Sequence, residues 1–463
     1  MSNPSMPQNS GQQGAKGVGA DHTDQRTGQL MEQVHILYED NHLLVVEKPV
    51  NIPVQGDISG DMDLLTLLKA YVKKKYDKPG DVYLGLVHRL DRPVGGVMVF
   101  ARTSKAAARL TAQFANRTAK KRYVAVTEGI AKPAARLEDW LVKDERTFSS
   151  AVVTEGTPGA KLAKLRYELL ATAEGKSLLN VELFTGRPHQ IRVQLAHAGL
   201  PIYGDQRYNP HAVPGEQIAL WAYALTLHHP TLGEEMTFTL LPKGKAYDNF
   251  PAQVALLPAF AVCRGVYVDE ELLVVDKNAG VETEGELLSQ LTALDLPGSS
   301  GELYPVHRLD ANTMGLVAFA RTEQMRTKLE KLFYNHDLKK IYHAVVKGVI
   351  DARGSLTHHV QKDGAEGMVR LCQPSAPGAM RCELTYRRLD TNGENSLAEI
   401  TLLTGRTHQI RVQMAAIGHP VLGDDKYGDR SWNKACGVRS QQLLAKELAL
   451  MGHTFTSTRE LTL

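Results

Sequence analysis

Two short polar segments interrupt apolar stretches in the first half of the chain and carry residue types suited to chemistry on a sugar or a base. The first, His-Arg-Leu-Asp (HRLD), covers residues 88–91, and the second, Gly-Arg-Pro-His-Gln-Ile-Arg, covers residues 186–192. An unpaired arginine is very costly to bury, so Arg192 is expected to pair with Asp91, which would keep that carboxylate ionised and fix its direction. The alternatives are a solvated hairpin for HRLD and a purely structural bridge for the pair.

A tyrosine at the start of an apolar strand, Tyr123, follows a Lys-Lys-Arg run at 120–122. Its ordinary role is core packing, whereas beside a basic patch it could stack on a nucleotide base. The stretch Arg102–Arg122 has seven Lys/Arg and no Asp/Glu, while Arg321–Ile341 has six Lys/Arg and three acidic residues. A charge run is usually a solvated face, but one-sided clustering also favours a phosphate-binding face.

Each of these features occurs twice, at a constant separation of 219 residues. The flanking letters drift between the two copies while the polar letters are kept, which favours a functional role over a solvated turn. A period of this length is a whole domain rather than a solenoid unit. HRLD recurs at 307–310, Lys121-x-Tyr123 at 340–342, the segment 186–194 at 405–413, and Gly204-Asp205-x-x-Tyr208 at 423–427.

The chain is therefore predicted to be a tandem duplication. Leu-Leu-Val-Val-Glu-Lys at 43–48 matches Leu-Leu-Val-Val-Asp-Lys at 272–277 with a separation of 229, so the second copy has lost ten residues before its HRLD. The N-terminal stretch is rich in Gly, Gln, Ser and Asn and has no secretory h-region. We predict a disordered tail at 1–30, a first copy at 31–258 and a second copy at 259–463, connected through 242–258.

The composition is that of a soluble globular protein, with 463 residues, 43% hydrophobic and 23% charged, which excludes collagen-like and disordered chains. No apolar run approaches the ~18 residues of a membrane span. Four cysteines without a C-x-x-C pair suit a reducing compartment and argue against a zinc ribbon. We expect a cytoplasmic monomer without membrane contact. The net charge of +3 divides into +4 for the first copy, −1 for the second and zero for the tail.

Short strands outnumber helices in each copy and do not alternate with them strictly. Residues 105–117 combine helix formers with apolar positions on one face. Pro188 and Gly199 predict a short helix between them, because proline favours the first helical position and glycine the position after the end. The pattern favours an α+β domain built on a mainly antiparallel sheet. Strands are expected at 43–46, 97–101, 123–127 and 178–184.

Three motifs, taken in their order along the chain, resemble those of the RluA-type family of RNA pseudouridine synthases. They are HRLD followed by a Gly-containing apolar strand, Lys-x-Tyr, and G-R-x-H-Q-I-R. The resemblance runs through both copies and covers 31–463. It implies that each copy has a mixed, mainly antiparallel sheet with flanking helices and a central basic cleft. It also implies isomerisation of uridine to pseudouridine in tRNA or rRNA, with no cofactor and no metal. A base inside a duplex must be flipped out for such chemistry.

The resemblance assigns roles to matching positions. The aspartate of HRLD is expected to be catalytic, the tyrosine to pack on the target base, and the last arginine to pair with the aspartate. These are Asp91 and Asp310, Tyr123 and Tyr342, and Arg192 and Arg411. RNA contacts are expected from Arg89, Arg308, His88, His307, Arg187, Arg406, His189, His408, Lys121 and Lys340.

The chain departs from the family pattern at two places. Many members have Thr-Ser-Gly after HRLD-x-x, where this chain has Val-Gly-Gly at 94–96 and Thr-Met-Gly at 313–315. Many have His after H-Q-I-R-x, where both copies have Gln, at Gln194 and Gln413. Neither change touches the three main roles.

Two other functions stay open. One is an RNA-binding or RNA-folding protein in which one or both sites are inactive, although a carboxylate in each cleft would repel phosphate. The other is a base-flipping hydrolase, which would release free uracil. The order of chemical steps at the aspartate is also open.

Overall fold

The computed structural model describes residues 31–32, 34–294, 296–298, 301–363 and 368–463. The tail predicted at 1–30 lies outside these residues. Along the described part of the chain, no helix is both long enough and apolar enough to cross a lipid bilayer.

Packing divides the chain into two compact units. The first comprises the residues up to Lys121 together with Ala224–Phe238, and the second comprises Arg122–Tyr223 together with Thr239–Leu463. These units are defined by contacts, whereas the copies at 31–258 and 259–463 are defined by repetition of sequence, so the copy boundaries stay a prediction. Three strands have residues in both units: β5 (Lys120–Glu128), β10 (Leu220–His228) and β11 (Glu235–Thr239).

The first unit contains antiparallel strands in the order β1-β2-β4, with the short strand β3 also paired to β4. Every residue of β2 and β4 is buried, as their apolar sequences predict. Helix α3 packs against β4, and its N-terminus is capped by the Thr103 side chain, which accepts a hydrogen bond from the backbone N–H of Ala106. The elements are β1 (Ile36–Glu39), β2 (Leu43–Lys48), α2 (Leu64–Lys75), β3 (Gly85–Leu86), β4 (Gly95–Ala101) and α3 (Ser104–Ala115).

The second unit contains most of β5 and four further strands of the first repeat, which pair antiparallel in the order β5-β9-β8-β6-β7. They are followed by helix α4. The predicted connection at 242–258 contains helix α5 (Pro251–Ala255) and two single 3-10 turns. The other bounds are β6 (Ala134–Asp144), β7 (Ser149–Val153), β8 (Lys161–Ala173), β9 (Lys176–Leu183) and α4 (Gln190–His197).

The second repeat lies wholly in the second unit and forms one sheet in the order β12-β13-β15-β21-β16-β20-β19-β17-β18, with β14 on β15 and β22 on β21. The pair β15–β21 is parallel, and the other paired strands described for this sheet are antiparallel. The predicted α+β fold, a mixed and mainly antiparallel sheet with flanking helices, is therefore confirmed. Its strands are β12 (Cys263–Val268), β13 (Leu272–Lys277), β14 (Tyr304–Pro305), β15 (Met314–Ala320), β16 (Lys339–Lys347), β17 (Arg353–Asp363), β18 (Met368–Leu371), β19 (Met380–Thr391), β20 (Asn395–Leu402), β21 (Leu443–Leu450) and β22 (His453–Thr456).

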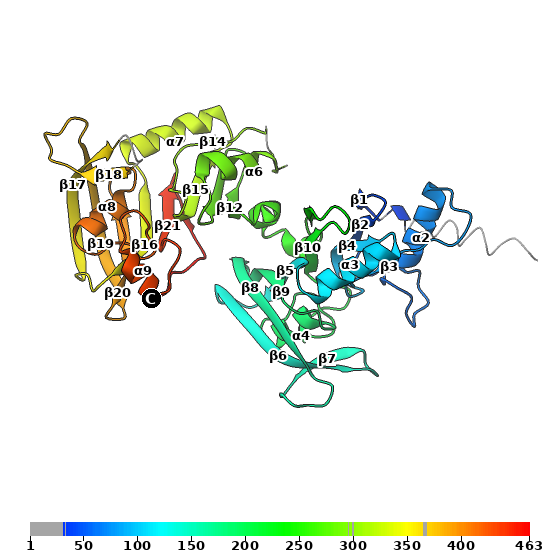
Figure 1. Cartoon of the computed structure of the whole chain (residues 1–463). Coiled ribbons are helices and arrows are strands. Elements are labelled where there is room, and N and C mark those ends of the chain that lie inside the picture. Colours follow the sequence, from blue (N-terminus) through cyan, green and yellow to red (C-terminus); the bar gives the residue numbers. More distant parts are fainter. Residues whose placement is uncertain (1–30, 33, 295, 299–300, 364–367) are drawn as a thin grey trace, which may run out of the picture. The chain divides into compact units, whose positions relative to one another are not determined.

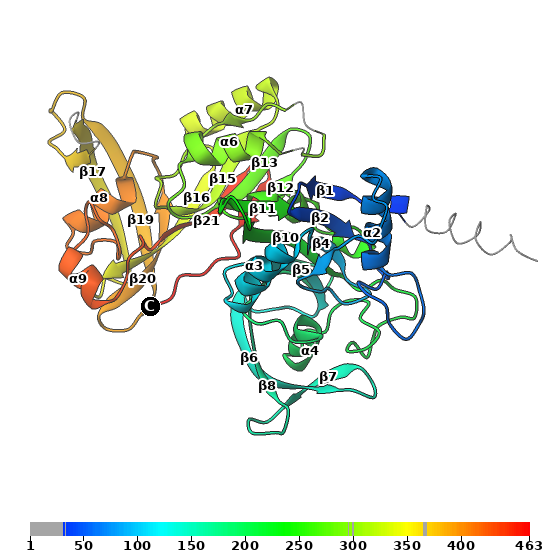
Figure 2. The same ribbon diagram turned by 45° about the vertical axis from the view of Figure 1, so that its right-hand side comes forward.

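The helices of the second repeat cover its sheet at several places. Helix α7 packs along β14 and β15, and α8 packs against β18 (Figure 1). Figure 2 shows α7 and α8 from another side. The ten residues missing from this repeat fall where the first repeat has α2; the second instead has a π-helical turn at Thr283–Leu287 that runs into α6. The helices are α6 (Leu288–Thr292), α7 (Glu323–Asn335), α8 (Gln409–Ala416) and α9 (Arg430–Ala435).

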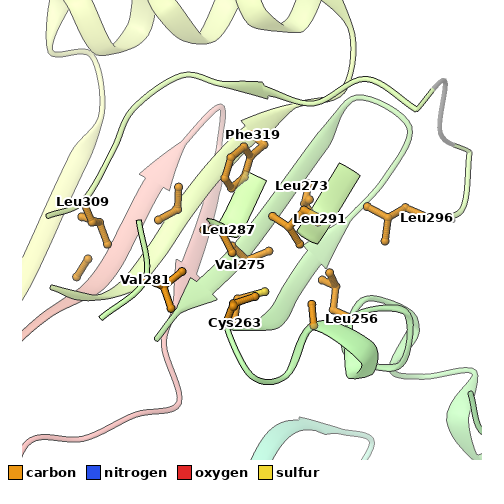
Figure 3. Packing of buried hydrophobic residues seen from close by; sticks show 14 residues of the cluster. Leu256, Cys263, Leu273, Val275, Val281, Leu287, Leu291, Leu296, Leu309 and Phe319 are labelled. Atoms are coloured by element: carbon orange, nitrogen blue, oxygen red, sulfur yellow. The ribbon is translucent and has the colours of Figure 1, made fainter. Parts of the chain in front are cut away.

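Strands β13 and β15 are buried on both faces, which explains the continuous apolar sequences at 272–275 and 314–320. On one face, Leu273 and Phe319 pack with Leu291 of α6 (Figure 3). On the other face, Val274 packs in a cluster with Leu329 of α7. The two strands thus form a rigid base for the loops at their ends.

Glycine is required where β15 meets β21. Gly315 has φ +113°, and a Cβ atom added there would lie 2.4 Å from the carbonyl oxygen of Ala445. The backbones of the parallel pair can therefore approach only because this residue has no side chain.

We expect Gly315→Ala to lower the free energy of unfolding by about 2–6 kcal/mol, because backbone strain costs about 1–3 kcal/mol and overpacking a similar amount. Gly437→Ala is the matched control, since Gly437 also has a positive φ but open space around its Cβ position. Gly437→Ala should lower the free energy of unfolding only by the cost of backbone strain, about 1–3 kcal/mol. Urea unfolding of the full chain measures both, and equal losses would show that the close approach is not limiting.

Candidate active site

The HRLD segment of the second repeat is anchored by its two less exposed residues. Leu309 belongs to the buried cluster on β13 and β15 (Figure 3). The imidazole Nε2 of His307 accepts a hydrogen bond from the backbone N–H of Ala318 at 2.9 Å, and its ring stacks on Phe333. Burial lowers the pKa of His307 to about 3, so the ring is neutral and acts as an acceptor for β15. Asp310 follows directly and keeps 26% of its side chain exposed.

A second loop, Gly-Arg-Thr-His-Gln at 405–409, is held in shape by one glutamine. The Oε1 atom of Gln409 accepts hydrogen bonds from the Thr404 hydroxyl at 2.8 Å and the Arg406 backbone N–H at 2.9 Å. Its Nε2 donates to the carbonyl of Glu383 at 2.9 Å. His408 then adopts a left-handed φ of 55° immediately before helix α8.

The helix predicted to open at Pro188 begins later than expected. In both repeats the left-handed histidine, His189 or His408, precedes the first helical residue, Gln190 or Gln409. Pro188 therefore lies in the loop, because the glutamine side chain closes a turn there before the helix can start. The predicted end is confirmed, since Gly199 has φ +76° just after α4.

Helix α8 delivers Arg411, whose side chain is only 4% exposed, into a set of carboxylates. Its Nη1 donates to Oδ2 of Asp310 at 3.0 Å. Its Nε and Nη2 donate to the two carboxylate oxygens of Asp424 at 2.7 and 2.8 Å. The expected pairing between the HRLD aspartate and the last arginine is therefore present in the second repeat, and a second carboxylate shares the guanidinium.

Asp424 is the principal anchor of that arginine. Its side chain is fully buried, and its Oδ1 also accepts the backbone N–H groups of Lys426 and Tyr427 at 2.9 and 3.0 Å. Burial raises the pKa of Asp424, but the hydrogen bonds from Arg411 and the backbone outweigh it, and the net pKa is lowered. The residue before it, Gly423, has φ +77°, and an added Cβ would lie 2.0 Å from the Ser440 carbonyl oxygen.

His408 faces the same aspartate. Its Nδ1 lies 2.9 Å from the hydroxyl of Tyr427, which itself accepts the backbone N–H of Val369 at 2.8 Å. The Tyr427 hydroxyl can then donate its proton to Nδ1 of His408, so a neutral His408 carries its own proton on Nε2. This Nε2 lies 3.8 Å from Oδ2 of Asp310. Burial is the main cause that lowers the pKa of His408, which favours this neutral form.

Strand β16 contributes a tyrosine and a lysine. Tyr342 is half-buried and packs against the cluster that contains Leu309. Burial, and then the neighbouring Asp310 carboxylate, raise the pKa of Tyr342, so its phenol stays protonated. Burial lowers the pKa of Lys340. The Nζ of Lys340 lies 3.1 Å from the position that a Cβ atom on Gly405 would take, so this glycine leaves room for the ammonium group.

A lysine that the sequence analysis gave no role lies beneath the aspartate. Lys277, at the end of β13, is fully buried and donates to the carbonyls of Asn278, Val281 and Ala311 at 2.8–3.0 Å. Burial lowers its pKa to about 8, against the opposing effect of Asp310. Lys48 is its counterpart in the first repeat, donates to three carbonyls and has a pKa of about 7 for the same main reason.

One cavity of about 630 Å³ in the second unit is lined by Asp310, Lys340, Tyr342, His408 and Arg411. Its size is that of ordinary small-molecule sites. Asp310 is the one acidic residue among the described lining residues, so the cavity is basic. All eight residues predicted for the site of the second repeat line it: His307, Arg308, Asp310, Lys340, Tyr342, Arg406, His408 and Arg411.

The predicted site residues of the first repeat fall into both compact units. Asp91, half-buried, belongs to the first unit, whereas Tyr123 and Arg192, both buried, belong to the second, so the pairing of Asp91 with Arg192 stays a prediction. The first unit also holds His88, which accepts the Val99 backbone N–H at 3.1 Å, together with exposed Arg89 and half-buried Lys121.

Within the second unit, the loop of the first repeat repeats the geometry of its counterpart. Arg192 donates to both oxygens of Asp205 at 2.8 and 2.7 Å, and His189 lies 2.8 Å from the Tyr208 hydroxyl. Arg187 donates to the Leu162 carbonyl at 3.2 Å.

The sequence analysis missed the carboxylates Asp205 and Asp424 and the tyrosines Tyr208 and Tyr427 as parts of the site. Their signal was the repeated Gly-Asp-x-x-Tyr. No group of three or more His, Cys, Asp or Glu in the described part of the chain is placed to hold a metal ion.

We expect Asp424→Asn to destabilise the second repeat by about 3–5 kcal/mol, because it leaves a buried guanidinium without its main carboxylate. The pKa of Asp424 is lower in the folded protein than in the unfolded chain. Its contribution is therefore complete above about pH 4 and is lost as the pH falls. Urea unfolding between pH 3 and 7 should show a weaker acid dependence in the variant. Asp425→Asn, at a 67% exposed carboxylate 3.7 Å from Arg411, is the control and should change little.

Comparison with known proteins identifies the repeated unit. The model of the RNA pseudouridylate synthase family matches residues 42–197 and again 271–416, together more than half of the chain. A solved structure, human RNA pseudouridylate synthase domain containing 4, is 25% identical, covers 48% of this chain and 94% of its own, and has a TM-score of 0.41.

Curated relatives carry the same kind of name. An uncharacterized RNA pseudouridine synthase of Aquifex aeolicus is 33% identical over 45% of this chain and 69% of its own length. Ribosomal large subunit pseudouridine synthase D of Zymomonas mobilis is 32% identical over 44% of this chain and 68% of its own length. Ribosomal large subunit pseudouridine synthase C of Vibrio parahaemolyticus is 31% identical over 43% of this chain and 63% of its own length. The matches thus span about two thirds of these relatives. The chain belongs to the RNA pseudouridylate synthase family of isomerases, and the family sequence occurs in it twice.

Proposed function

We propose that this chain converts uridine to pseudouridine in structured RNA, and that each repeat does so with its own aspartate, Asp91 or Asp310. The observation that carries the proposal is the placement of Asp310, paired with Arg411 and beside Tyr342, in a basic cavity. The same residue types at the same spacing in the first repeat support a second site of the same kind.

The reaction breaks the N1–C1′ glycosidic bond, turns the uracil and joins C1′ to C5. C5 then loses its proton and N1 carries one, so no oxidant, reductant or cofactor is needed. Separation at C1′ builds positive charge on the sugar, which a fixed carboxylate can stabilise or trap. Arg411 fixes the direction of the Asp310 carboxylate, and His408 presents an N–H beside it.

The uracil must leave its stack before Asp310 can reach it, at a cost of a few kcal/mol. Tyr342 offers the extruded base a flat and uncharged neighbour, which suits a base that has to rotate. Arg308 and Arg406 are exposed at the same cavity, where they can pair with phosphates on either side of the target.

Ribosomal RNA is the substrate class that we propose first, and tRNA is the alternative. Ribosomal RNA is supported by the names of the relatives from Zymomonas mobilis and Vibrio parahaemolyticus. We further propose that the protein works as a monomer, because the second repeat holds all eight of its site residues around one cavity. We also propose that it acts in the cytoplasm, since four cysteines without a C-x-x-C pair suit a reducing compartment.

The test is tritium release from RNA that carries [5-³H]uridine. We expect Asp91→Ala and Asp310→Ala each to abolish the modification made by its own repeat, and the double variant to lose at least about a thousandfold in rate. Asp351→Ala, at an exposed aspartate outside both sites, is the control and should retain full activity.

Full activity in the double variant would overturn the mechanism. RNA binding that is unchanged by the substitutions, with no pseudouridine formed by any variant, would instead identify an RNA-binding or RNA-folding protein. Free uracil among the products would identify a hydrolase.

A further inference from the structure

One large aromatic side chain at the cavity of the second repeat has no role in the chemistry described above. Tyr334, in the last turn of α7, lines the cavity and is nevertheless 86% exposed. An aromatic ring in that position contributes little to folding, because almost none of its surface is removed from water. The corresponding residue of the first repeat is Ala115, at the same separation of 219 residues.

Tyr334 is held in a defined place relative to the catalytic segment. The preceding residue, Phe333, stacks on His307 with ring centroids 4.5 Å apart, which joins the end of α7 to HRLD. The helix is capped at its start by Thr322 and ends at Asn335, and His336 directly after it has a left-handed conformation. The backbone that carries the ring is therefore fixed, although the ring itself faces solvent.

The surroundings of the ring are positively charged. Arg308, Lys340 and Arg406 line the same cavity. His336 also lines it. Burial first, and then the charges of Lys340 and Arg406, lower the pKa of His336. An exposed ring among cations that can hold phosphates is the arrangement by which proteins bind single-stranded nucleic acid.

We propose that Tyr334 is a stacking platform for the base of a nucleotide next to the target uridine, and that Arg406 and Lys340 hold the phosphate between the two. The proposal rests on the proposed function, since it takes the uridine at Asp310 as the reference point. It gives the second repeat a subsite that the first repeat lacks, and it requires the neighbouring nucleotide to be unstacked as well. The second repeat would therefore select uridines whose neighbour is unpaired.

The first experiment measures the contact without turnover. Tyr334→Trp is placed in the Asp310→Ala protein, and its fluorescence is followed as single-stranded decauridine RNA is added. We expect quenching by the stacked base, after subtraction of the signal from the three native tryptophans. Leu371→Trp, at a partly exposed position on β18 that does not line the cavity, is the matched control and should not respond. Absence of RNA-dependent quenching at position 334, or equal quenching at both positions, would overturn the proposal.

The second experiment measures the effect on the reaction. The Asp91→Ala background isolates the second repeat, and its target is a ribosomal RNA fragment with the modified uridine mapped beforehand. We expect Tyr334→Ala to raise KM about tenfold with little change in kcat, and Tyr334→Phe to restore it, because the ring and not the hydroxyl does the stacking. An abasic nucleotide beside the target uridine should raise the KM of the parent protein by a similar factor and leave the KM of the Tyr334→Ala variant unchanged.

The two experiments separate the proposal from the function on which it rests. If the Asp91→Ala protein forms no pseudouridine in any RNA while Tyr334→Trp is still quenched, catalysis by the second repeat fails and the stacking contact stands. If pseudouridine forms and Tyr334→Ala has an unchanged KM, the function stands and the stacking subsite is wrong.

Discussion

The buried guanidinium of Arg411 is the interaction on which the rest of the site depends. Arginine cannot lose its charge inside a protein, so its burial requires carboxylates that match its planar set of donors. Asp424 takes one edge of the guanidinium and Asp310 takes the remaining nitrogen. Since these residues come from HRLD, α8 and the turn at 423–427, one charge fixes three segments relative to each other. The Asp310 carboxylate is thereby aimed before any substrate arrives, which is what the proposed catalysis needs.

The backbone around this charge is adapted to it at specific residues. Gly423 allows the turn that points Asp424 at Arg411, because any side chain there would collide with the Ser440 carbonyl. His408 takes a left-handed conformation so that Gln409 can close the loop and the helix can present Arg411 inward. Strained or glycine-only conformations of this kind persist where the surrounding packing over-determines them. Here that packing is the doubly covered pair β13 and β15, into which Leu309 is inserted.

The fold class and the eight predicted residues that meet at the cavity of the second repeat could be predicted from the sequence. The comparison of two copies within one chain distinguished polar residues that are identical in both copies from neighbouring residues that differ. The sequence was insufficient for Asp424, which pairs with an arginine thirteen residues away through a turn, a separation that no helix or strand period singles out. The start of α4 could not be predicted either, since a proline such as Pro188 normally opens a helix and the side-chain hydrogen bonds of Gln190 delay this one. Lys277 appeared as an ordinary strand-end lysine, because its three carbonyl partners belong to loops that the strand pattern does not locate.

The two repeats share the loop that holds the buried arginine and differ in other residues at the cavity. This distribution bears on why the chain contains both repeats. Each loop has the same arginine, paired aspartate, left-handed histidine and loop-closing glutamine. The corresponding hydrogen bonds of the arginine and the glutamine differ by 0.1 Å in length between the two repeats. One difference lies at the exposed side of the cavity, where Ala115 of the first repeat corresponds to Tyr334 of the second. Changes that spare the carboxylate and its support leave the chemistry intact, while changes at the rim alter which RNA fits, because specificity is a difference between the affinities for two competing substrates. Under the proposed function, the duplication places one reaction on two surfaces, and the more basic first copy and the exposed Tyr334 of the second copy would read different features of RNA.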